Sequence, residues 1–453
     1  MSNHLSTVAF TDLVKWSVHF LKTTDLGYKK EFRLYRIGDF LTRNRNTTEI
    51  EDEVEYRRVT VKLYSKGVTQ RDSLKGKNIG TKRQFLISPG QFIMSKIDAR
   101  NGAFGIVPDK LDGAIVTADF LSYNIEEKKI SPRFLHLLTT TNQFIRFCQN
   151  SSSGTTGRQR VKESEFLDIR IPLPDLQTQN RLVDAYDENT RFALDHENKA
   201  DEMKKSVEQY LYAELGVEYT PRKIMEKNNI LQFVQYSEIT KWSLNHILKS
   251  QMYSFRSCTY GVVSFESVLL RFDGGKTPSK SNIDFWENGS ICWTSPKDFK
   301  GLYLTDSEDK ITDAAINSGG VKLFPKGTIL AVFRSGILRR AFPVMLTETE
   351  TAINQDLKAL TVDTSRVETL FFFYYLHLFQ KMILEGSSKV GVTVESINTV
   401  DFLKLPLVLP PIKKQKEIVE NISRMKLEIE ENNALAYNLR IQAIDDFEKE
   451  IFE

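Results

Sequence analysis

The sequence predicts an α+β protein made of two similar domains, separated by two long antiparallel helices that form a coiled coil. The main observation is a stretch that occurs twice, FLDIRIPLPDLQTQNRLV at 166–183 and FLKLPLVLPPIKKQKEIV at 402–419. Each copy is a short apolar segment, then proline, then a long charged segment, which is the pattern of a strand leading into a helix. Because the same stretch recurs in the second half of a 453-residue chain, we expect two related halves.

The beginning and the middle of each half support this duplication. The segment 8–22, VAFTDLVKWSVHFLK, matches 234–249, VQYSEITKWSLNHILK, and both contain Lys-Trp-Ser. Each middle, 33–150 or 265–385, mixes short strand patterns with turn residues. We therefore expect one α+β fold used twice with different surface loops.

Two pairs of matching positions lie inside the middles. Pro89-Gly90 precedes the apolar segment QFIMSKI, as Pro325-Lys326-Gly327 precedes TILAVF. The segment VTADFLSYNI at 116–125 corresponds to INQDLKALTV at 353–362. These matches indicate equivalent strands in the two halves.

Each middle ends in an apolar segment that predicts a helix, at 132–147 in the first half and 367–384 in the second. The second contains LFFFYYLHLF at 370–379, about half the length that a membrane span requires, so a buried helix is expected. We predict no membrane partner.

The two long helices are each expected to begin at a proline. Pro174 and Pro410 suit the first turn of a helix, and Gln179 and Gln415 follow five residues later. Both helices continue for about forty residues, which corresponds to roughly 60 Å of helix. We predict a rod that holds two globular parts apart, with ordinary packing of each helix on its own domain as the alternative.

Small and apolar residues recur every seven positions in both helices, which predicts a helix-pairing seam. The same surface is the expected docking site for a partner protein. The predicted set for pairing and docking is Gln179, Tyr186, Ala193, Ala200, Val207, Gln415, Ile422, Ile429, Ala436 and Ala443.

From these patterns we divide the chain into four parts. They are a first domain at 1–170, a first long helix at 171–222, a second domain at 223–405 and a second long helix at 406–453.

Composition is that of a soluble globular protein, with 41% hydrophobic and 27% charged residues. The three cysteines, Cys148, Cys258 and Cys292, show no CxxC spacing, which fits reduced thiols in a cytoplasm and argues against a zinc site. The beginning MSNHLSTVAF has no pattern of a secretory signal.

Charge is distributed unevenly although the net charge is only +3. Residues 57–110 hold twelve Lys or Arg against three acids, whereas 175–215 holds ten acids against five bases. A local positive surface predicts contact with phosphate, and the acidic helix is expected to face protein. Two Gly/Ser-rich loops, 151–161 with Arg158 and Arg160, and 386–394, could also lie along a phosphate backbone, or could be ordinary exposed connectors.

Motifs for catalysis and cofactor binding are missing from the sequence. The fragment Gly274-Gly275-Lys276-Thr277 resembles the end of a P-loop, but the glycine required upstream would fall at Leu270. There is no GxGxxG, no Asn-Pro-Pro or Asp-Pro-Pro, no HExxH and no GxSxG. We therefore predict no catalytic residues, no metal site and no cofactor bound by this chain.

A metal-dependent nuclease is one alternative function. Pro108-Asp109 with Glu126-Glu127-Lys128 fits the residue types, and so does Pro174-Asp175 with Glu197-Asn198-Lys199. The second set lies along one helix with members about 33 Å apart, so it cannot chelate one ion. A coiled-coil scaffold with two protein-binding heads is the other alternative.

Two dissimilar α+β middles, each leading through an apolar segment, prolines and a downstream Gln into a long helix, resemble the DNA-specificity subunit of type I restriction–modification systems. The segment GGKTPSKSNIDFWENGSICWTSPKDF at 274–299 is similar to the Gly-Gly-x-Thr-Pro opening of that family, and Ile-Asn-Gln at 353–355 to a triplet that it often carries. The first half departs from this pattern, because TRNRNTTE at 42–49 stands where the second half has FDGGKTPS at 272–279.

The resemblance implies a non-catalytic subunit for phage defence in a prokaryotic cytoplasm. Each target-recognition domain would read one half of an asymmetric bipartite site in double-stranded DNA, and the paired helices would fix the spacer. The implied partners are two methyltransferase subunits and restriction or translocase subunits, with S-adenosylmethionine bound by the methyltransferase.

Basic and polar residues of both domains are candidates for DNA contact, through phosphates or base edges. In the first domain they are Arg57, Arg58, Lys62, Lys66, Lys75, Lys77, Lys82, Arg83, Arg100, Arg158 and Arg160. In the second domain they are Lys276, Thr277, Ser279, Lys280, Asn282, Ser295, Lys297, Arg334, Arg339 and Arg340.

Overall fold

The computed structural model describes residues 29, 31–64, 66–150, 152–153, 160–219, 253–389 and 395–452. The matched Lys-Trp-Ser segments and most of the two Gly/Ser loops lie outside these residues. The chain divides into two compact units, 1–197 with 433–453, and 198–432.

Within the residues described, the first domain contains two larger sheets and two strand pairs. A four-stranded sheet has the order β2-β10-β7-β8, and a five-stranded sheet has the order β3-β6-β9-β4-β5. The strands are β1 (Leu34–Arg36), β2 (Leu41–Arg43), β3 (Thr47–Glu49), β4 (Glu55–Val61), β5 (Val68–Lys75), β6 (Arg83–Leu86), β7 (Phe92–Ser95), β8 (Phe104–Ile106), β9 (Ile115–Val116), β10 (Phe120–Ile125), β11 (Ser152–Ser153), β12 (Arg160–Val161) and β13 (Arg170–Pro172). The pairs are β1 with β13 and β11 with β12.

The described part of this domain also contains three short helices, α2 (Pro132–Thr140), α3 (Asn142–Asn150) and α4 (Glu163–Leu167). The single helix predicted at 132–147 is wrong, because Thr141 takes an extended backbone between α2 and α3. The Thr141 hydroxyl donates to the carbonyl of Leu138 and accepts from the backbone N–H of Phe144. One side chain therefore ends the first helix and begins the second.

The second domain repeats this plan. Its sheets have the orders β17-β25-β22-β23-β19 and β20-β18-β24-β21. The strands are β14 (Glu218–Tyr219), β15 (Tyr253–Ser254), β16 (Val262–Ser264), β17 (Leu269–Gly274), β18 (Ile291–Thr294), β19 (Tyr303–Leu304), β20 (Asp309–Ile311), β21 (Leu323–Phe324), β22 (Ile329–Val332), β23 (Val344–Thr347), β24 (Thr351–Ile353), β25 (Leu357–Val362), β26 (Ser388–Lys389), β27 (Ser396–Ile397) and β28 (Pro406–Val408).

Its helices are α8 (Asp313–Asn317), α9 (Thr369–Leu378), α10 (Gln380–Ser387) and α11 (Thr399–Leu403). The continuous helix predicted at 367–384 is also wrong, because the chain turns at Phe379. The Phe379 ring stacks on Tyr375 with centroids 4.2 Å apart and packs on Tyr212 at 4.9 Å. The interruption thus accompanies burial of Phe379 in the domain core.

Short 3-10 helices connect the elements of both domains. They are η2 (Ile37–Asp39), η3 (Gly76–Asn78), η4 (Ala99–Asn101), η5 (Asp109–Leu111), η7 (Phe265–Val268), η8 (Ile283–Phe285), η9 (Pro296–Asp298) and η10 (Gly336–Arg339).

The prediction of one fold used twice is confirmed by the strand pairing. The order β2-β10-β7-β8 matches β17-β25-β22-β23, and the parallel pair β4–β9 matches the parallel pair β18–β24. The turns before β7 and β22 both need a glycine, since Gly90 and Gly327 have φ of 75° and 85°. The matching segments 116–125 and 353–362 end in β10 and β25, the equivalent strands.

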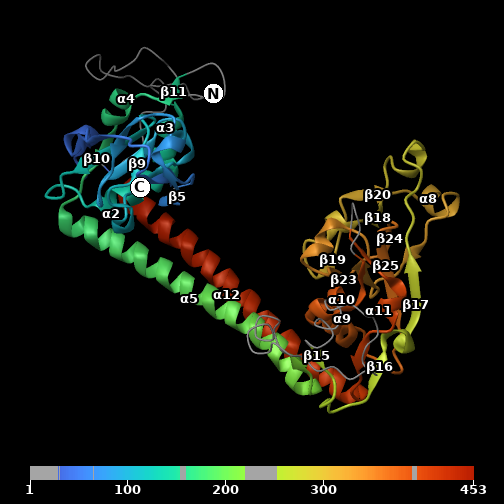
Figure 1. The fold of residues 1–453 in the computed structure, drawn as a ribbon. Helices are drawn as coiled ribbons and strands as arrows, with labels where there is room; N and C mark the ends of the chain where they lie inside the picture. The colour runs from blue at the N-terminus through green and yellow to red at the C-terminus, as the bar shows by residue number, and fades with distance from the viewer. Residues whose placement is uncertain are drawn as a thin grey trace. The chain divides into compact units, whose positions relative to one another are not determined.

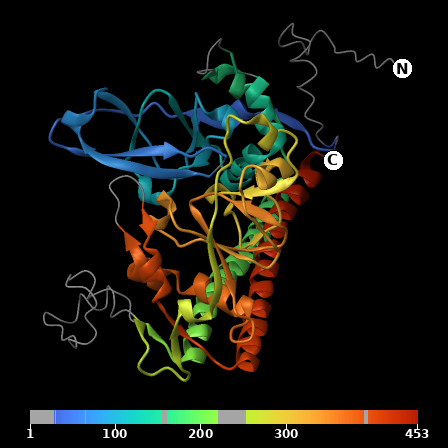
Figure 2. The same ribbon diagram turned by 90° about the vertical axis from the view of Figure 1, so that its right-hand side faces the viewer.

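Two long helices, α5 (Leu176–Leu215) and α12 (Ile412–Phe452), pair with each other in antiparallel fashion within each unit. In the first unit Arg440 forms two hydrogen bonds of 2.9 Å with Glu197. In the second unit Lys414 pairs with Glu214 at 2.8 Å. Arg181 also pairs with Glu450 at 3.3 Å in the first unit, and Asn421 donates to the Tyr210 hydroxyl at 2.8 Å in the second. Within each unit the partner numbers therefore fall along α12 as they rise along α5 (Figure 1, Figure 2).

Residues at the sevenfold spacing are buried in the structure, where a packed seam places its small side chains. Tyr186 is partly buried and packs on the core of the first domain. The buried members are Ala193, Ala200, Val207, Ile422, Ile429, Ala436 and Ala443.

Gln179 and Gln415 require a correction, because they are fully buried and offer no surface for docking. The Gln179 amide donates to the carbonyls of Pro174 and Lys129, and its oxygen accepts from the N–H of Ser131, at the start of α2. The prolines also differ from expectation, since each lies just before the first turn and supplies a carbonyl acceptor.

Gln415 makes the same three bonds in the second domain. Its amide donates to the carbonyls of Pro410 and Arg366, and its oxygen accepts from the N–H of Glu368, at the start of α9. Each glutamine therefore joins the beginning of a long helix to the beginning of a core helix of its own domain.

Across the described ranges, no helix combines the length and apolar character of a membrane span. The three cysteines are free, and burial raises the pKa of the Cys148 thiol.

Candidate nucleic-acid interface

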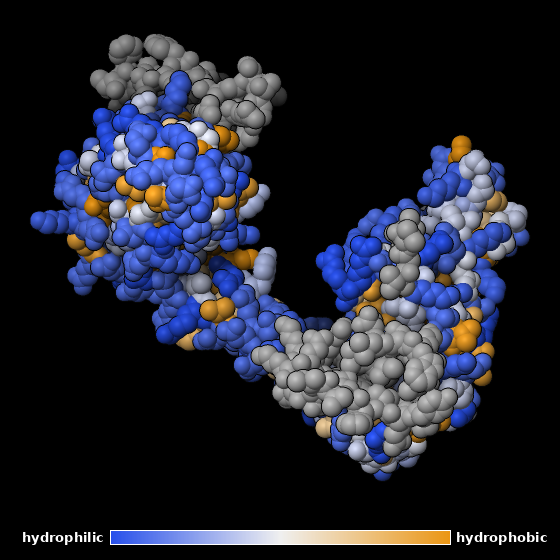
Figure 3. Space-filling view, in the orientation of Figure 1, coloured by the Kyte–Doolittle hydropathy of each residue, from blue (hydrophilic) through white to orange (hydrophobic). Residues whose placement is uncertain are grey.

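A pocket lined by arginines opens on the surface of the first domain. Figure 3 shows that this surface is largely hydrophilic, with scattered hydrophobic residues. The pocket encloses about 530 Å³. Its lining comes from the end of β2 and the following loop, from β3 and β6, from the turn before β10 and from the start of α4. The lining residues are Arg43, Arg45, Thr47, Arg83, Phe85, Ala118 and Glu163.

Arg43 is held rigidly at one side of this pocket, with only 16% of its side chain exposed. Its guanidinium donates to the carbonyl of Ser122 at 3.0 Å and lies 3.5 Å from the Glu163 carboxylate. It also lies over the rings of Phe85 and Tyr123, at 5.5 and 5.4 Å from their centroids. These contacts satisfy a charge that is mostly removed from water.

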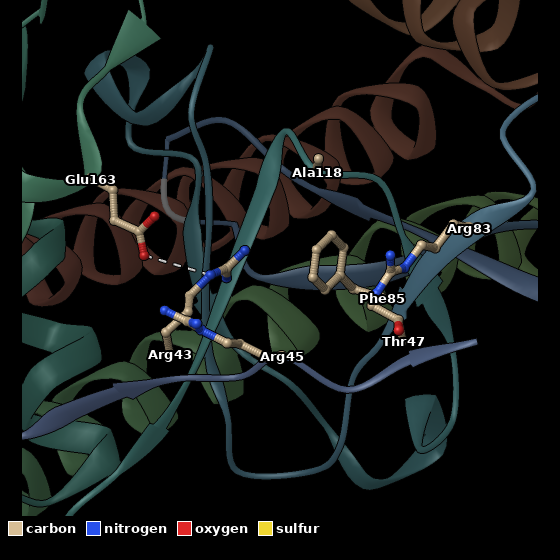
Figure 4. A pocket seen from close by; sticks show the side chains of 7 residues that line it. All are labelled: Arg43, Arg45, Thr47, Arg83, Phe85, Ala118 and Glu163. Atoms are coloured by element: carbon tan, nitrogen blue, oxygen red, sulfur yellow. Dashed lines mark ion pairs between the residues drawn. The ribbon is translucent and has the colours of Figure 1, made fainter. Parts of the chain in front are cut away.

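Glu163 is oriented by the same group of residues. The buried Tyr123 hydroxyl donates to Glu163 Oε1 at 3.1 Å, and Figure 4 shows the carboxylate facing Arg43. The Glu163 side chain nevertheless remains 37% exposed. An acceptor is therefore fixed beside a set of donors.

Arg45 and Arg83 complete the pocket as exposed side chains (Figure 4). Neither guanidinium has an ion pair or hydrogen bond within the described parts of the chain. Arg83 and Phe85 are two residues apart on β6, so their side chains lie on the same face of the strand.

Five of the other predicted basic residues of the first domain have intramolecular partners. Arg58 forms two bonds with Asp72, at 2.8 and 2.7 Å, and this lowers the pKa of the Asp72 carboxyl. Arg57 donates to the backbone carbonyls of Lys110 and Asp112.

Acids that precede the basic segment fold back on it. Lys75 and Lys77 pair with Glu53, and Lys82 pairs with Asp52 at 2.6 Å. Counting charges only from residue 57 onward therefore overstates the local positive field, because residues 52 and 53 lie outside that window.

The remaining candidates of this domain are the exposed Lys62 and Lys66, which flank the turn between β4 and β5. Arg158, and the side chains of Arg100 and Arg160, lie outside the described parts of the structure. The pocket residues Arg43, Arg45, Phe85 and Glu163 were missed by sequence reasoning. The two arginines of TRNRN, two residues apart at the end of β2, were a signal for basic side chains there but not for the pocket.

In the second domain four of the candidates from 276 to 282 bond within their own loop or hold that loop to other segments. Lys276 donates to the carbonyl of Gly319, and Thr277 donates to Gln355 at 2.5 Å. The Asn282 oxygen accepts from the N–H of Asp284 and caps η8. The Ser279 hydroxyl bonds the Ser281 hydroxyl at 2.8 Å.

The prediction that Ser295 contacts DNA is wrong, because Ser295 is buried and its N–H and hydroxyl both donate to Asp298. It has no group left to present to a base edge. Lys297 pairs with Glu308 and Asp309. Lys280 lies at the edge of a second pocket, of about 420 Å³, that Ile283 and Trp286 also line.

The three arginines from 334 to 340 are exposed. Arg334 pairs with Asp356 at 2.6 Å and Arg339 pairs with Glu395. Arg340 has no ion pair with any described residue. Lys276, Lys280 and Lys297 are exposed as well, and among these basic candidates Lys280 and Arg340 are the two whose side chains have no partner in the described residues.

The residues considered for a nuclease have separate structural roles and do not form one site. Asp109 begins η5 and Glu126 pairs with Lys129 at 3.0 Å. Asp175 caps α5 through the N–H of Thr178, and Glu197 bonds Arg440. Among the described residues, no cluster of three His, Cys, Asp or Glu side chains could hold a metal ion.

The two domains carry different groups at the equivalent place of the fold. When the matched segments 116–125 and 353–362 are aligned, Ala118 and Gln355 occupy equivalent positions. Ala118 lines the arginine pocket, whereas Gln355 accepts a hydrogen bond from Thr277. The scaffold is the same and the presented chemistry differs.

Comparisons with known proteins point to one family. The model of the type I restriction modification DNA specificity domain matches residues 29–204 and 263–436. The specificity subunit of the type I restriction enzyme EcoR124I/EcoR124II from Escherichia coli is 33% identical over 178 residues, which cover 39% of this chain and 43% of that protein. The specificity subunit of the HindI enzyme from Haemophilus influenzae is 21% identical over 375 residues, 74% of this chain and 78% of that protein.

A solved structure concerned with complex assembly and conformational transition of the type I R-M system shares the fold. Its chain has a TM-score of 0.60 and 16% identity, and the match covers 93% of this chain and 98% of that chain. The two matches to the family model lie on the two halves that the strand pairing shows to be equivalent. The chain therefore belongs to the family of type I restriction modification DNA specificity domains.

Proposed function

We propose that this chain is the DNA-specificity subunit of a type I restriction–modification complex, in which each domain reads one half of an asymmetric bipartite target. The observation that carries the proposal is the duplicated scaffold with different polar groups at equivalent positions. A scaffold used twice supplies two readers, and dissimilar readers require dissimilar half-sites.

The paired helices are proposed to fix the spacer between the half-sites and to dock two methyltransferase subunits. Apolar side chains on their outer faces support the docking role, since they are 40–65% exposed and have no core to fill. They are Phe192, Leu194, Leu427, Leu435, Tyr437 and Ile441.

Catalysis is proposed to reside in the partners. The methyltransferase subunits would bind S-adenosylmethionine and modify the target, and a restriction or translocase subunit would join for cleavage. The complex would act in a prokaryotic cytoplasm against foreign DNA such as that of a phage.

The proposal is tested by co-expressing the chain with the methyltransferase subunit encoded beside it and sequencing the methylome. We expect methylation at one bipartite motif with two different half-sites and a fixed spacer. Methylation at a single continuous motif, or none in cells that contain the assembled complex, would contradict it.

A second measurement addresses catalysis by the chain itself. Purified chain is incubated with plasmid and Mg²⁺, and we expect no cutting. Cleavage that is lost in Asp109→Ala would instead favour the nuclease.

A further inference from the structure

We propose that the arginine pocket of the first domain reads a G·C base pair in the half-site of that domain. This inference rests on the proposed function and assigns specificity to residues of the pocket: Arg45, Arg83 and Glu163.

The donors are the two exposed arginines at the pocket rim. Arg45 and Arg83 are exposed, and neither guanidinium is paired within the described residues, so their N–H groups are available to a ligand. A guanidinium presents a planar fork of donors that matches the O6 and N7 acceptors of guanine in the major groove.

The acceptor is Glu163. Its carboxylate is held in place by the Tyr123 hydroxyl at 3.1 Å and by Arg43 at 3.5 Å, while 37% of the side chain stays exposed. A carboxylate accepts from the N4 amino group of cytosine. Donors for guanine and an acceptor for cytosine therefore converge on one pocket.

Glu163 also argues against a simple phosphate site. A carboxylate inside the pocket repels a phosphate and would be out of place in a surface that only tracks the backbone. The mixture of donors and one acceptor is what the edge of a base pair requires.

The pocket is preorganised rather than loose. Arg43 is fixed by a carbonyl, a carboxylate and two aromatic rings, and it in turn holds Glu163. Fixed donors and acceptors lose little conformational entropy on binding and discriminate against a wrong partner.

The second domain lacks this arrangement at the equivalent place. Gln355 and Thr277 bond each other where the first domain has Ala118 and the arginine loop. The G·C contact is therefore assigned to the first half-site alone.

The test uses the complex with its methyltransferase subunit and compares the methylome of wild type with Arg45→Lys and Arg83→Lys. Lysine keeps the charge but loses the bidentate fork, so phosphate binding is retained and base reading is weakened. We expect methylation at the preferred motif to drop about 10- to 100-fold, with relaxed preference at one G·C pair of one half-site. The other half-site and the spacer stay unchanged.

Glu163→Gln supplies the second variant. It keeps the shape and the bond from Tyr123 but adds an amide donor, so we expect the cytosine of the same base pair to be recognised less strictly. Arg36→Ala is the control, since Arg36 is another exposed arginine of this domain, pairs with Asp168 and lies outside the pocket.

Three outcomes overturn the proposal. They are a first half-site without a G·C pair, equal loss at all motifs without a change of preference, and variants indistinguishable from Arg36→Ala. In each case a wild-type bipartite motif would leave the proposed function standing, whereas its absence would remove the proposed function as well.

Discussion

Gln179 and Gln415 are buried, and each uses both amide N–H groups and its oxygen in three bonds of between 2.7 and 3.1 Å. Two carbonyls and one N–H in each domain depend on a single amide. A buried polar group that loses its partner costs about 1 to 3 kcal/mol.

We therefore expect Gln179→Leu to lower the free energy of unfolding by about 2 to 5 kcal/mol, because three backbone groups lose their partner at once. Urea denaturation measures the change. Gln177→Leu is the matched control, since Gln177 is exposed on the same helical turn and its replacement should change stability by less than about 0.5 kcal/mol. Equal effects of the two variants would show that the buried amide contributes little.

His377 on α9 gives a prediction for the effect of pH. Burial, together with the charge of Lys426, lowers its pKa from 6.5 to about 4. Between these values the unfolded chain binds a proton that the folded chain does not, so stability falls as pH falls from 6.5 to 4. The loss is on the order of 2 to 3 kcal/mol.

Urea midpoints at pH 7 and pH 4.5 should differ less in His377→Gln than in the wild type. A His377→Gln variant with unchanged pH dependence would contradict the assignment.

For single residues, the sequence showed which side chains are basic but not which acids they pair with in the folded chain. Lys75, Lys77 and Lys82 were expected to be available for phosphate, but Asp52 and Glu53 fold back on them. The pocket could not be predicted, because Arg43 and Glu163 are brought together only by the pairing of β2 with β10 and the position of α4.

Among the elements, the long helices followed most directly from the sequence, because period and length are local properties. Ala193 and Ala436 stand at sevenfold spacing and are buried. The helix breaks at Thr141 and Phe379 could not be predicted in the same way. The Thr141 hydroxyl caps a helix end and the Phe379 ring packs on Tyr212, and both contacts depend on neighbours that only the folded chain brings into place.

The helices also give a prediction for the spacer. Inserting seven residues after Asn198 and seven after Asn432 keeps the heptad phase and lengthens both helices by about 10 Å. If the helices set the spacing, the methylated motif should gain about three base pairs of spacer, at 3.4 Å each. Both half-sites should remain as they were, and an unchanged spacer would contradict the proposed role.

In the whole molecule, the first compact unit is assembled from distant parts of the sequence. Residues 433–453 belong with 1–197, and Phe447, Ile451 and Phe452 lie in the core of the first domain. The Phe447 ring packs on Phe134 with centroids 5.9 Å apart.

Phe447→Ala should therefore destabilise the first unit by about 3 to 5 kcal/mol, because it leaves a cavity in that core. Hydrogen exchange should show lost protection in β7 and β10 and retained protection in β22 and β25. Tyr437→Ala is the control, since Tyr437 is 65% exposed on the same helix. Loss of protection in the second unit alone would refute this account.

The composition of the first unit also sets an order of folding during synthesis. The ribosome completes Glu197 and then makes the 235 residues of the second unit before it reaches Asn433. At about 5 to 20 residues per second this interval is about 12 to 47 s. During it, the first domain must wait with the core surface for Phe447 and Ile451 uncovered, while the second unit can already close. The domain that is translated first is thus the one that is finished last, and it is the one that a chaperone would be expected to hold.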